Sequence, residues 1–159
     1  EYKTASFTLV VLPIAAGTYY LRNKGADMYA EASALSSDPS VIQENQNGNE
    51  TQKWVFEYDN NGYYNIYSAA DTSPKLYLTV NSDDEIVLGT SASDTGAKWK
   101  IEVTSSGAYK LTAKCAEGSN LVLSAAAEAY CAGEELFQAA YQNNANYTDE
   151  WEILIEFVS

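Results

Sequence analysis

Short runs of alternating apolar and polar residues recur along the whole chain, and turn-forming residues separate them. Tyr, Val, Ile, Leu and Trp fill the apolar positions, whereas Gly, Asn, Asp and Ser lie between the runs. Alternation with a period of two is typical of strands that bury one face. No window of about a dozen residues has an apolar stripe at helical spacing, and we expect at most one helical turn in the alanine-rich stretch 124–132. The pattern therefore predicts an all-β protein.

The pattern occurs three times. The copies open at Gly17, Gly62 and Gly107, each on a Gly-x-Tyr-x-(Leu/Ile) run, and successive openings are 45 residues apart (62−17 and 107−62). A fixed period of this length is typical of repeated supersecondary units that bury their apolar faces against one another. Each copy closes on Trp-x-(Phe/Ile), at Trp54, Trp99 and Trp151.

Each copy contains four strand-like runs, so the sequence predicts twelve strands. Propellers usually have about four to eight blades, and closure into one barrel with a hairpin cap would remove exposed strand edges. We therefore predict a β-trefoil of three four-stranded repeats with pseudo-threefold symmetry, at about 17–59, 62–104 and 107–157. The three tryptophans and the opening tyrosines are expected in the core or at its rim, namely Trp54, Trp99, Trp151, Tyr19, Tyr64 and Tyr109.

The first residues lie outside the three copies. A strand-like run covers 6–11, and Pro13 follows it as a breaker. Residues 1–13 are interpreted either as the terminal strand of a preceding domain or linker, or as an arm that belongs to this fold. The trefoil domain is predicted to cover 14–159.

Charge disfavours one large class of partners. The chain has 22 acidic and 9 basic residues, a net charge of −13, so it would repel phosphate backbones and anionic membrane surfaces. No apolar run approaches the roughly 20 residues of a membrane-spanning helix. We expect neither nucleic acid binding nor membrane insertion.

Residue types also constrain chemistry. The chain has no histidine, so it cannot build a Ser-His-Asp or Cys-His system. Paired carboxylates could support glycoside hydrolysis, but the sequence singles out no pair. The acidic segment 81–85 lacks the central glycine and the distant glutamate of a calcium loop, which favours a solvated turn. We predict no catalytic residue, no metal and no cofactor.

Both cysteines, Cys115 and Cys131, belong to the third copy and flank its second strand. A hairpin could bring them together, and a disulfide over a loop of this length would contribute about 3 kcal/mol. The spacing favours a disulfide and hence an oxidising compartment. Two free thiols are the alternative.

The closing motifs carry a family resemblance. Gln52-Lys-Trp54, Ala97-Lys-Trp99 and Asp149-Glu-Trp151 resemble the Gln-x-Trp repeats of the ricin-B-type lectin domain, a β-trefoil, over about 16–157. The opening Gly-Thr-Tyr-Tyr-Leu-Arg-Asn and the ending Asp-Glu-Trp-Glu-Ile are most similar to copies in secreted multidomain proteins of Gram-positive bacteria. The resemblance implies a non-catalytic, monomeric module that binds a glycan or polysaccharide and targets a larger secreted or cell-surface protein to it.

Two positions depart from the family pattern. Members that bind galactose have an Asp after the Leu of the second strand and an Asn before the Gln of Gln-x-Trp. We find Tyr29, Tyr77 and Val122 at the first position, and Thr51, Gly96 and Thr148 at the second. The resemblance therefore does not imply the usual galactose site.

A sugar site needs polar groups for hydroxyls and an aromatic ring in a partly exposed loop. The third copy supplies both just before its closing motif, and we predict carbohydrate binding by Tyr141, Asn143, Asn144 and Asp149. Residues 45–49 of the first copy offer amides without an aromatic, and residues 90–94 of the second copy offer the weakest set. Among tyrosines outside the repeat frame, Tyr130 and Tyr147 are further candidates.

Two other functions fit the same fold. A β-trefoil can present one rigid loop to a protease as an inhibitor, although the low Lys and Arg content disfavours trypsin-like targets. A structural or protein-docking domain that has lost its sugar pocket is the second alternative.

Overall fold

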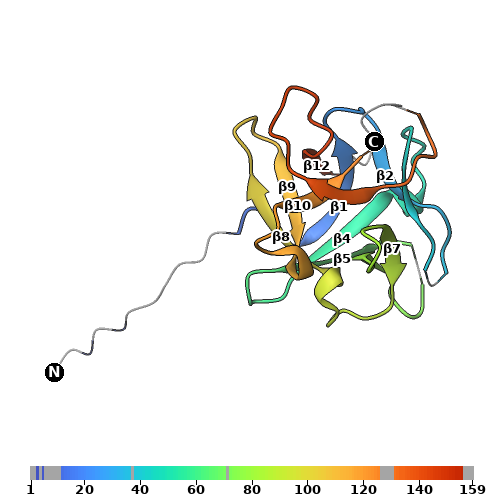
Figure 1. Cartoon of the computed structure of the whole chain (residues 1–159). Coiled ribbons are helices and arrows are strands. Elements are labelled where there is room, and N and C mark those ends of the chain that lie inside the picture. The colour runs from blue at the N-terminus through green and yellow to red at the C-terminus, as the bar shows by residue number, and fades with distance from the viewer. Residues whose placement is uncertain are drawn as a thin grey trace.

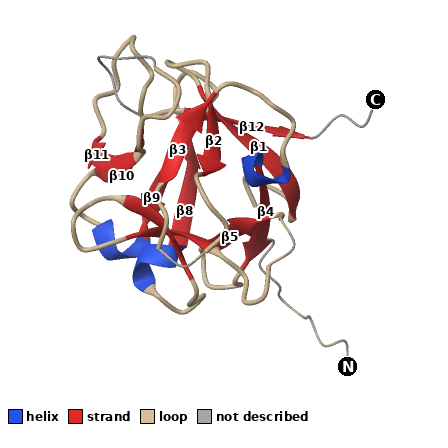
Figure 2. Cartoon of the chain, turned by 90° about the vertical axis from the view of Figure 1, so that its right-hand side faces the viewer, coloured by secondary structure: helices blue, strands red, loops and turns tan. Residues whose placement is uncertain are grey.

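The computed structural model describes residues 12–36, 38–70, 72–125 and 131–155, together with Lys3 and Ala5. Within these residues the chain forms twelve strands, four in each copy, and three single-turn 3-10 helices, η1 (Glu50–Gln52), η2 (Thr95–Ala97) and η3 (Lys114–Ala116). Strands therefore dominate the ribbon, and helix occurs only as short turns (Figure 2). The all-β prediction and the predicted four-strand repeat are confirmed. The strands are β1 (Gly17–Asn23), β2 (Tyr29–Ala32), β3 (Val41–Glu44), β4 (Lys53–Tyr58), β5 (Tyr64–Ser68), β6 (Tyr77–Val80), β7 (Ile86–Gly89), β8 (Lys98–Val103), β9 (Tyr109–Ala113), β10 (Leu121–Ser124), β11 (Phe137–Ala140) and β12 (Trp151–Ile155).

Six strands close into a barrel. The first and fourth strands of each copy pair with each other, as β1 with β4, β5 with β8 and β9 with β12. Neighbouring copies join through β4 with β5, β8 with β9, and β12 with β1. All of these pairs are antiparallel, and Figure 1 shows the copies following one another around the barrel. Closure leaves none of the six barrel strands as an edge strand, which is why the predicted β-trefoil is stable against edge-to-edge pairing.

The second and third strands of each copy form a hairpin that caps the barrel, as β2–β3, β6–β7 and β10–β11. Isolated bridges join the three hairpins pairwise. Ser40 bridges Val87, Ile42 bridges Glu135, and Glu85 bridges Phe137. The cap is therefore a triangle in which each hairpin contacts both others. The acidic segment 81–85 is the tight turn of one hairpin.

The closing tryptophan of each copy joins barrel to cap. Trp54, Trp99 and Trp151 have no exposed surface. Each indole Nε1–H donates a hydrogen bond of 2.9 to 3.0 Å to a backbone carbonyl on the second strand of the same copy. The acceptors are Ala30, Leu78 and Leu123. The tryptophans are core residues, as predicted, and the polar end of each ring is satisfied inside the core.

The chain enters the barrel at Ile14, which is buried among core residues. The hydroxyl of Tyr64 donates to the Ile14 carbonyl at 2.5 Å, and that of Tyr19 donates to the Ala15 carbonyl at 2.7 Å. Tyr64 is fully buried, and Tyr19 and Tyr109 pack against the core at its rim. This anchoring is consistent with a domain that begins at residue 14, which stays a prediction. The run 6–11 lies outside the described residues.

The third copy differs from the others in its hairpin connection. Residues 125–136 join β10 to β11, whereas residues 81–85 join the corresponding strands of the second copy. Residues 126–130 lie outside the described part, so the helical turn expected in the alanine-rich stretch and the candidate Tyr130 are not tested.

The predicted disulfide is wrong, because Cys115 and Cys131 are both free and exposed. Cys115 lies on η3, which packs against η2 of the second copy. The Cys131 carbonyl accepts a hydrogen bond of 2.9 Å from the Gln43 side chain of the first copy. Cys115 thus lies beside the second copy, whereas Cys131 lies beside the first copy.

We predict that Trp99→Phe lowers the free energy of unfolding by about 3 kcal/mol, because it leaves the buried Leu78 carbonyl without its donor and creates a cavity. Urea unfolding measures this loss. Val103→Ala, at a side chain that is 61% exposed, should change stability by less than about 0.5 kcal/mol. Similar losses for both variants would contradict a special role for the indole.

We predict that the purified protein carries two free thiols. Alkylation in denaturant without reductant, followed by mass measurement, should add two labels to each chain. Addition of reductant should leave the melting temperature unchanged. Labelling that occurs only after reduction would show instead that Cys115 and Cys131 form a disulfide.

Candidate functional site

A cluster of polar side chains lies at the edge of the cap in the first copy, centred on Glu31 of β2. Its carboxylate accepts from Thr51 Oγ1 at 2.9 Å, from Gln52 Nε2 at 3.2 Å, and from Asn47 Nδ2 at 3.1 and 3.3 Å. We name Glu31, Asn47, Thr51 and Gln52 the Glu31 cluster. Glu31 and Thr51 are half-buried and Asn47 is exposed, so the cluster reaches the surface.

Gln52 holds the loop that completes this cluster. It is fully buried, its Oε1 accepts from the backbone N–H of Asn47 at 3.0 Å, and its Nε2 donates to the Asn45 carbonyl at 2.7 Å. The loop turns at Gly48, whose φ of 75° lies in the left-handed region that glycine adopts without strain. Because a buried side chain fixes the backbone at Asn45 and Asn47, the polar atoms around Glu31 are preorganised.

The structural register explains why the sequence comparison missed Glu31. The carbonyl that accepts each indole N–H belongs to Ala30, Leu78 or Leu123, and the next residue is Glu31, Thr79 or Ser124. The family pattern was compared at the positions two residues before these, Tyr29, Tyr77 and Val122, and none of those side chains is a carboxylate. The hydroxyls of Thr79 and Ser124 donate to carbonyls of their own strands at 2.8 and 3.0 Å. Among these three equivalent residues, Glu31 alone extends to the loop before the closing strand. Strand alternation was the available signal, because it places Glu31 on the same face as Tyr29.

In the third copy, two of the four predicted site residues hold the loop. Asp149 is 3% exposed, and its Oδ2 accepts from the backbone N–H of Gln142 at 2.6 Å. Its Oδ1 is enclosed and has no hydrogen-bond partner among the described residues. Asn144 Oδ1 accepts from the backbone N–H of Asn146 at 2.9 Å. Asp149 therefore braces its loop as Gln52 does in the first copy.

The other two predicted residues do lie together. The Tyr141 hydroxyl is 3.2 Å from Asn143 Oδ1 and 3.3 Å from the buried Glu150 Oε1, and can donate to one of them at a time. Burial, followed by the negative charges of Glu150 and Asp149, raises the pKa of Tyr141. The Nζ of Lys110 lies 5.0 Å from the Tyr141 ring centroid. The candidate Tyr147 instead packs under Lys24, at 4.3 Å.

The family comparison agrees with this architecture. The model of the ricin-type beta-trefoil lectin domain-like family matches residues 5–85, which are 81 of the 159 residues. The chain belongs to this family. A search of curated proteins finds no match.

Solved structures show the same fold for most of this ricin-type domain. A mosquitocidal holotoxin is 22% identical with a TM-score of 0.79, and the alignment covers 89% of this chain but 17% of the holotoxin chain. The designed threefold symmetric protein ThreeFoil is 18% identical with a TM-score of 0.76, over 87% of this chain and 99% of its own. A ricin B-like lectin from Macrolepiota procera, solved in complex with lactose, is 16% identical with a TM-score of 0.71, over 90% and 98%. At these identities the likeness establishes the fold alone.

The second copy of the ricin-type domain uses its polar loop for turn formation. Asp94 accepts from the backbone N–H of Gly96 at 2.8 Å and so caps η2, and the hydroxyls of Ser91 and Ser93 lie 3.1 Å apart. A Cβ at position 96 would lie 2.3 Å from the Val80 carbonyl oxygen, so this position requires glycine. The loop is closely packed against the cap hairpin.

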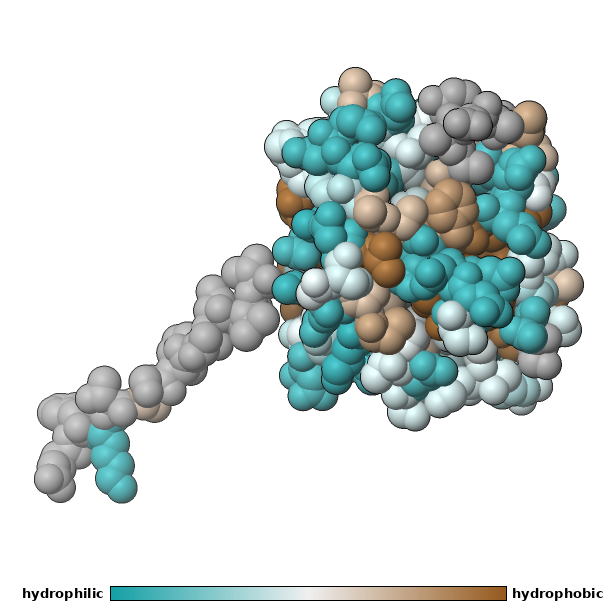
Figure 3. Space-filling model, in the orientation of Figure 1, coloured by the Kyte–Doolittle hydropathy of each residue, from teal (hydrophilic) through white to brown (hydrophobic). Residues whose placement is uncertain are grey.

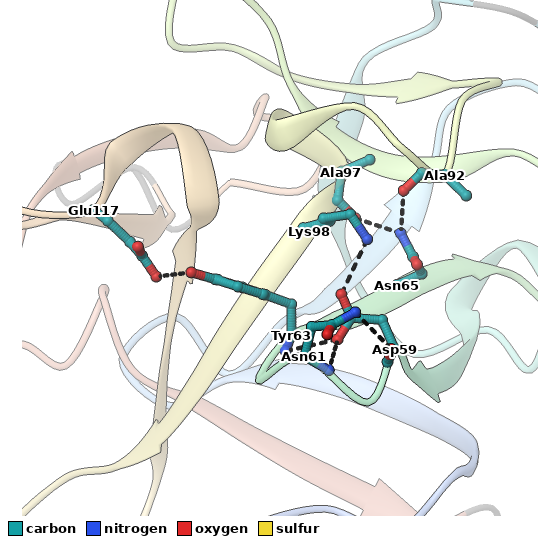
Figure 4. Close-up of polar contacts among 8 residues, drawn as sticks. All are labelled: Asp59, Asn61, Tyr63, Asn65, Ala92, Ala97, Lys98 and Glu117. Atoms are coloured by element: carbon teal, nitrogen blue, oxygen red, sulfur yellow. Dashed lines mark hydrogen bonds and ion pairs between the residues drawn. The ribbon is translucent and has the colours of Figure 1, made fainter.

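A further polar cluster lies where the first and second copies join (Figure 4). Asp59 Oδ1 accepts from the backbone N–H groups of Asn61 and Tyr63 at 2.8 and 3.1 Å, and Lys98 Nζ donates to Asp59 Oδ2 at 3.0 Å. The Tyr63 hydroxyl donates to Glu117 of the third copy. These groups bind one another and link the three copies, which indicates a structural role.

The described part of the chain contains no group of three or more His, Cys, Asp or Glu residues placed to bind a metal ion. None of its helices is long and apolar enough to cross a membrane. On the face shown in Figure 3, hydrophilic residues predominate and hydrophobic residues form small separate patches.

We predict a pH-dependent cost for Asp59→Asn. Burial by itself raises the pKa of Asp59. Hydrogen bonds from the amides of Asn61 and Tyr63 and from Lys98 lower this pKa by a larger amount, so the net shift is downward. The stabilisation is therefore present above the unfolded-state pKa and is lost as the pH falls through the folded-state pKa. Asn keeps an acceptor for the amides and loses the ion pair, which should cost about 1 kcal/mol at pH 7.

Urea unfolding of the wild type and of Asp59→Asn at pH 7 and at pH 3 or below measures this cost. The difference in unfolding free energy should shrink as the pH falls through the lowered pKa of Asp59, because the wild-type carboxylate then loses its charge and the ion pair with Lys98. A difference that stays constant with pH would show that the ion pair is not its source.

Proposed function

We propose that this ricin-type domain is a non-catalytic carbohydrate-binding module that binds a neutral glycan at the Glu31 cluster. The observation that carries the proposal is the Glu31 carboxylate, which the side chains of Asn47, Thr51 and Gln52 hold at the surface of the cap. Membership of a lectin-like family supports the proposal. The sugar-bound state of the Macrolepiota procera lectin is consistent with it.

The carboxylate suits neighbouring sugar hydroxyls because it presents two acceptor oxygens side by side. The Asn47 amide is shared between both oxygens at 3.1 and 3.3 Å, whereas Thr51 binds one oxygen at 2.9 Å. Asn47 lies on an exposed loop, so sugar hydroxyls can take its place at little cost. Thr51 and Gln52 would continue to hold the carboxylate in position.

The charge of the module favours neutral sugars. The net charge is −13, and the centre of the proposed site is itself a carboxylate. An acidic sugar would be repelled both by this carboxylate and by the overall field. Neutral hydroxyls, in contrast, gain a charge-assisted hydrogen bond.

A role within a larger extracellular protein is part of the proposal. The alignment spans 17% of the mosquitocidal holotoxin chain, an example of this fold within a much longer protein. A single shallow site gains little over the cost of association, so neighbouring modules in one protein would raise the effective affinity. The absence of histidine from the chain agrees with a binding role, and we expect no hydrolytic activity.

A second site is proposed in the third copy, at Tyr141 and Asn143. There the hydroxyl of the half-buried Tyr141 lies 3.2 Å from the Asn143 amide oxygen on the surface loop. Asn144 and Asp149 would support this site by holding the loop.

The test is a glycan array probed with the folded domain presented multivalently, as wild type, Glu31→Gln, Tyr141→Ala and Glu102→Gln. Loss of a hydrogen bond to a charged group costs about 1.5 to 3 kcal/mol, so Glu31→Gln should weaken binding by about 10-fold or more. Glu102→Gln, which alters another half-buried carboxylate on a strand, should bind as the wild type does. Thermal unfolding of each variant confirms that it is folded.

The variants separate the two proposed sites. Binding lost only in Glu31→Gln supports the first copy, and binding lost only in Tyr141→Ala places the site in the third copy instead. Losses in both indicate two sites that act together through avidity. No binding by the wild type across neutral glycans would overturn the lectin proposal.

A further inference from the structure

A hollow of about 440 Å³ lies next to the Glu31 cluster, lined by Tyr20, Tyr29, Gln46, Ile153, Leu154 and Ile155. It lies where β1, β2 and β12 meet the loop 45–49 of the first copy. We name it the Tyr29 groove. The groove is lined by uncharged side chains, although 31 of the 159 residues of the chain are charged (22 acidic and 9 basic).

The groove is continuous with the cluster because residues of the two are neighbours along the chain at two places. Tyr29 and Glu31 are two residues apart on β2 and share its outward face, because the intervening Ala30 is buried. Side chains at this spacing lie about 7 Å apart along a strand, so one glycan of two or more units is long enough to reach both. On the loop, Gln46 of the groove directly precedes Asn47 of the cluster.

The groove also has the chemistry of a sugar platform. Tyr20 and Tyr29 form an edge-to-face pair with centroids 5.7 Å apart and an interplanar angle of 82°, so the more buried Tyr20 fixes the ring of Tyr29. A fixed ring can stack on the apolar face of a sugar at little cost in entropy. Gln46 adds an amide for hydroxyls, and Ile155 is 66% exposed and gains from being covered.

We propose that the Tyr29 groove binds the second sugar unit of a glycan whose first unit is held by the Glu31 cluster. This inference rests on the proposed function. It identifies the ligand class as a neutral oligosaccharide of two or more units, and it makes Tyr29 and Gln46 residues that determine specificity. The uncharged lining and the continuity with a hydroxyl-binding carboxylate favour a sugar ring over the apolar side chain of a protein partner.

The test compares monosaccharides with disaccharides that contain them, by calorimetric titration of the whole chain. Suitable pairs are galactose with lactose, glucose with cellobiose, mannose with mannobiose, and N-acetylglucosamine with chitobiose. For the preferred sugar we expect the wild type to bind the disaccharide about 10-fold more tightly than the monosaccharide. In Tyr29→Ala this ratio should fall towards one.

Two further variants separate loss of the subsite from loss of folding. Tyr29→Phe keeps the ring and should keep most of the ratio, whereas Gln46→Ala, on the exposed loop, should reduce it without affecting the melting temperature. Glu31→Gln should weaken both ligands together.

The outcomes distinguish this inference from the proposed function. If the wild type binds a monosaccharide and its disaccharide equally well, or if Tyr29→Ala weakens both to the same extent, the groove is not a second subsite and the module still binds sugar. If no sugar of either length binds, the proposed function itself fails.

Discussion

The hydrogen bond from each closing tryptophan to the second strand of its own copy is the interaction on which the rest of the structure depends. It lies in the buried core, where an unpaired indole N–H or carbonyl would be costly. Because the donor is on a barrel strand and the acceptor is on a cap hairpin, this bond sets the register between the two parts of each copy. In the first copy the acceptor is Ala30, so the same bond positions Glu31 at the surface.

The scaffold is threefold, but the chemistry at its surface is not. Equivalent positions after the acceptor carbonyls carry Glu31, Thr79 and Ser124, and only the glutamate contacts the loop before its closing strand. The loops themselves are braced by different means. A buried Gln52 serves the first copy, a buried Asp149 the third, and the cap of η2 by Asp94 the second. A repeated core can tolerate such divergence because loop contacts are local, whereas the core contacts are shared by all copies.

This separation between core and loops suits a binding module. The barrel is closed and the cap hairpins support one another, so surface loops can change without exposing a strand edge. Loops fixed by buried side chains lose little conformational freedom when a ligand binds. In the first copy, the braced loop 45–49 links the Glu31 cluster to the Tyr29 groove and can therefore present both as one preorganised surface.

The sequence by itself determined the repeat, the strand pattern and the fold. Periodic Gly, Tyr and Trp residues mark positions that must be buried in every copy, and alternation reports burial directly. The three buried tryptophans and the four strands of each copy follow from that signal.

The tertiary structure decided the site and the state of the cysteines. The way in which β2 lies against β4 decides which carbonyl accepts from Trp54, and the residue after that carbonyl is Glu31. The family pattern was compared at Tyr29, two residues earlier. The fold places Cys115 beside the second copy and Cys131 beside the first, and the burial of Asp149 gives it a bracing role. The contacts of Cys131 with Gln43 and of Trp54 with Ala30 join residues that are distant along the chain, and a period of two or of 45 residues contains no information about them.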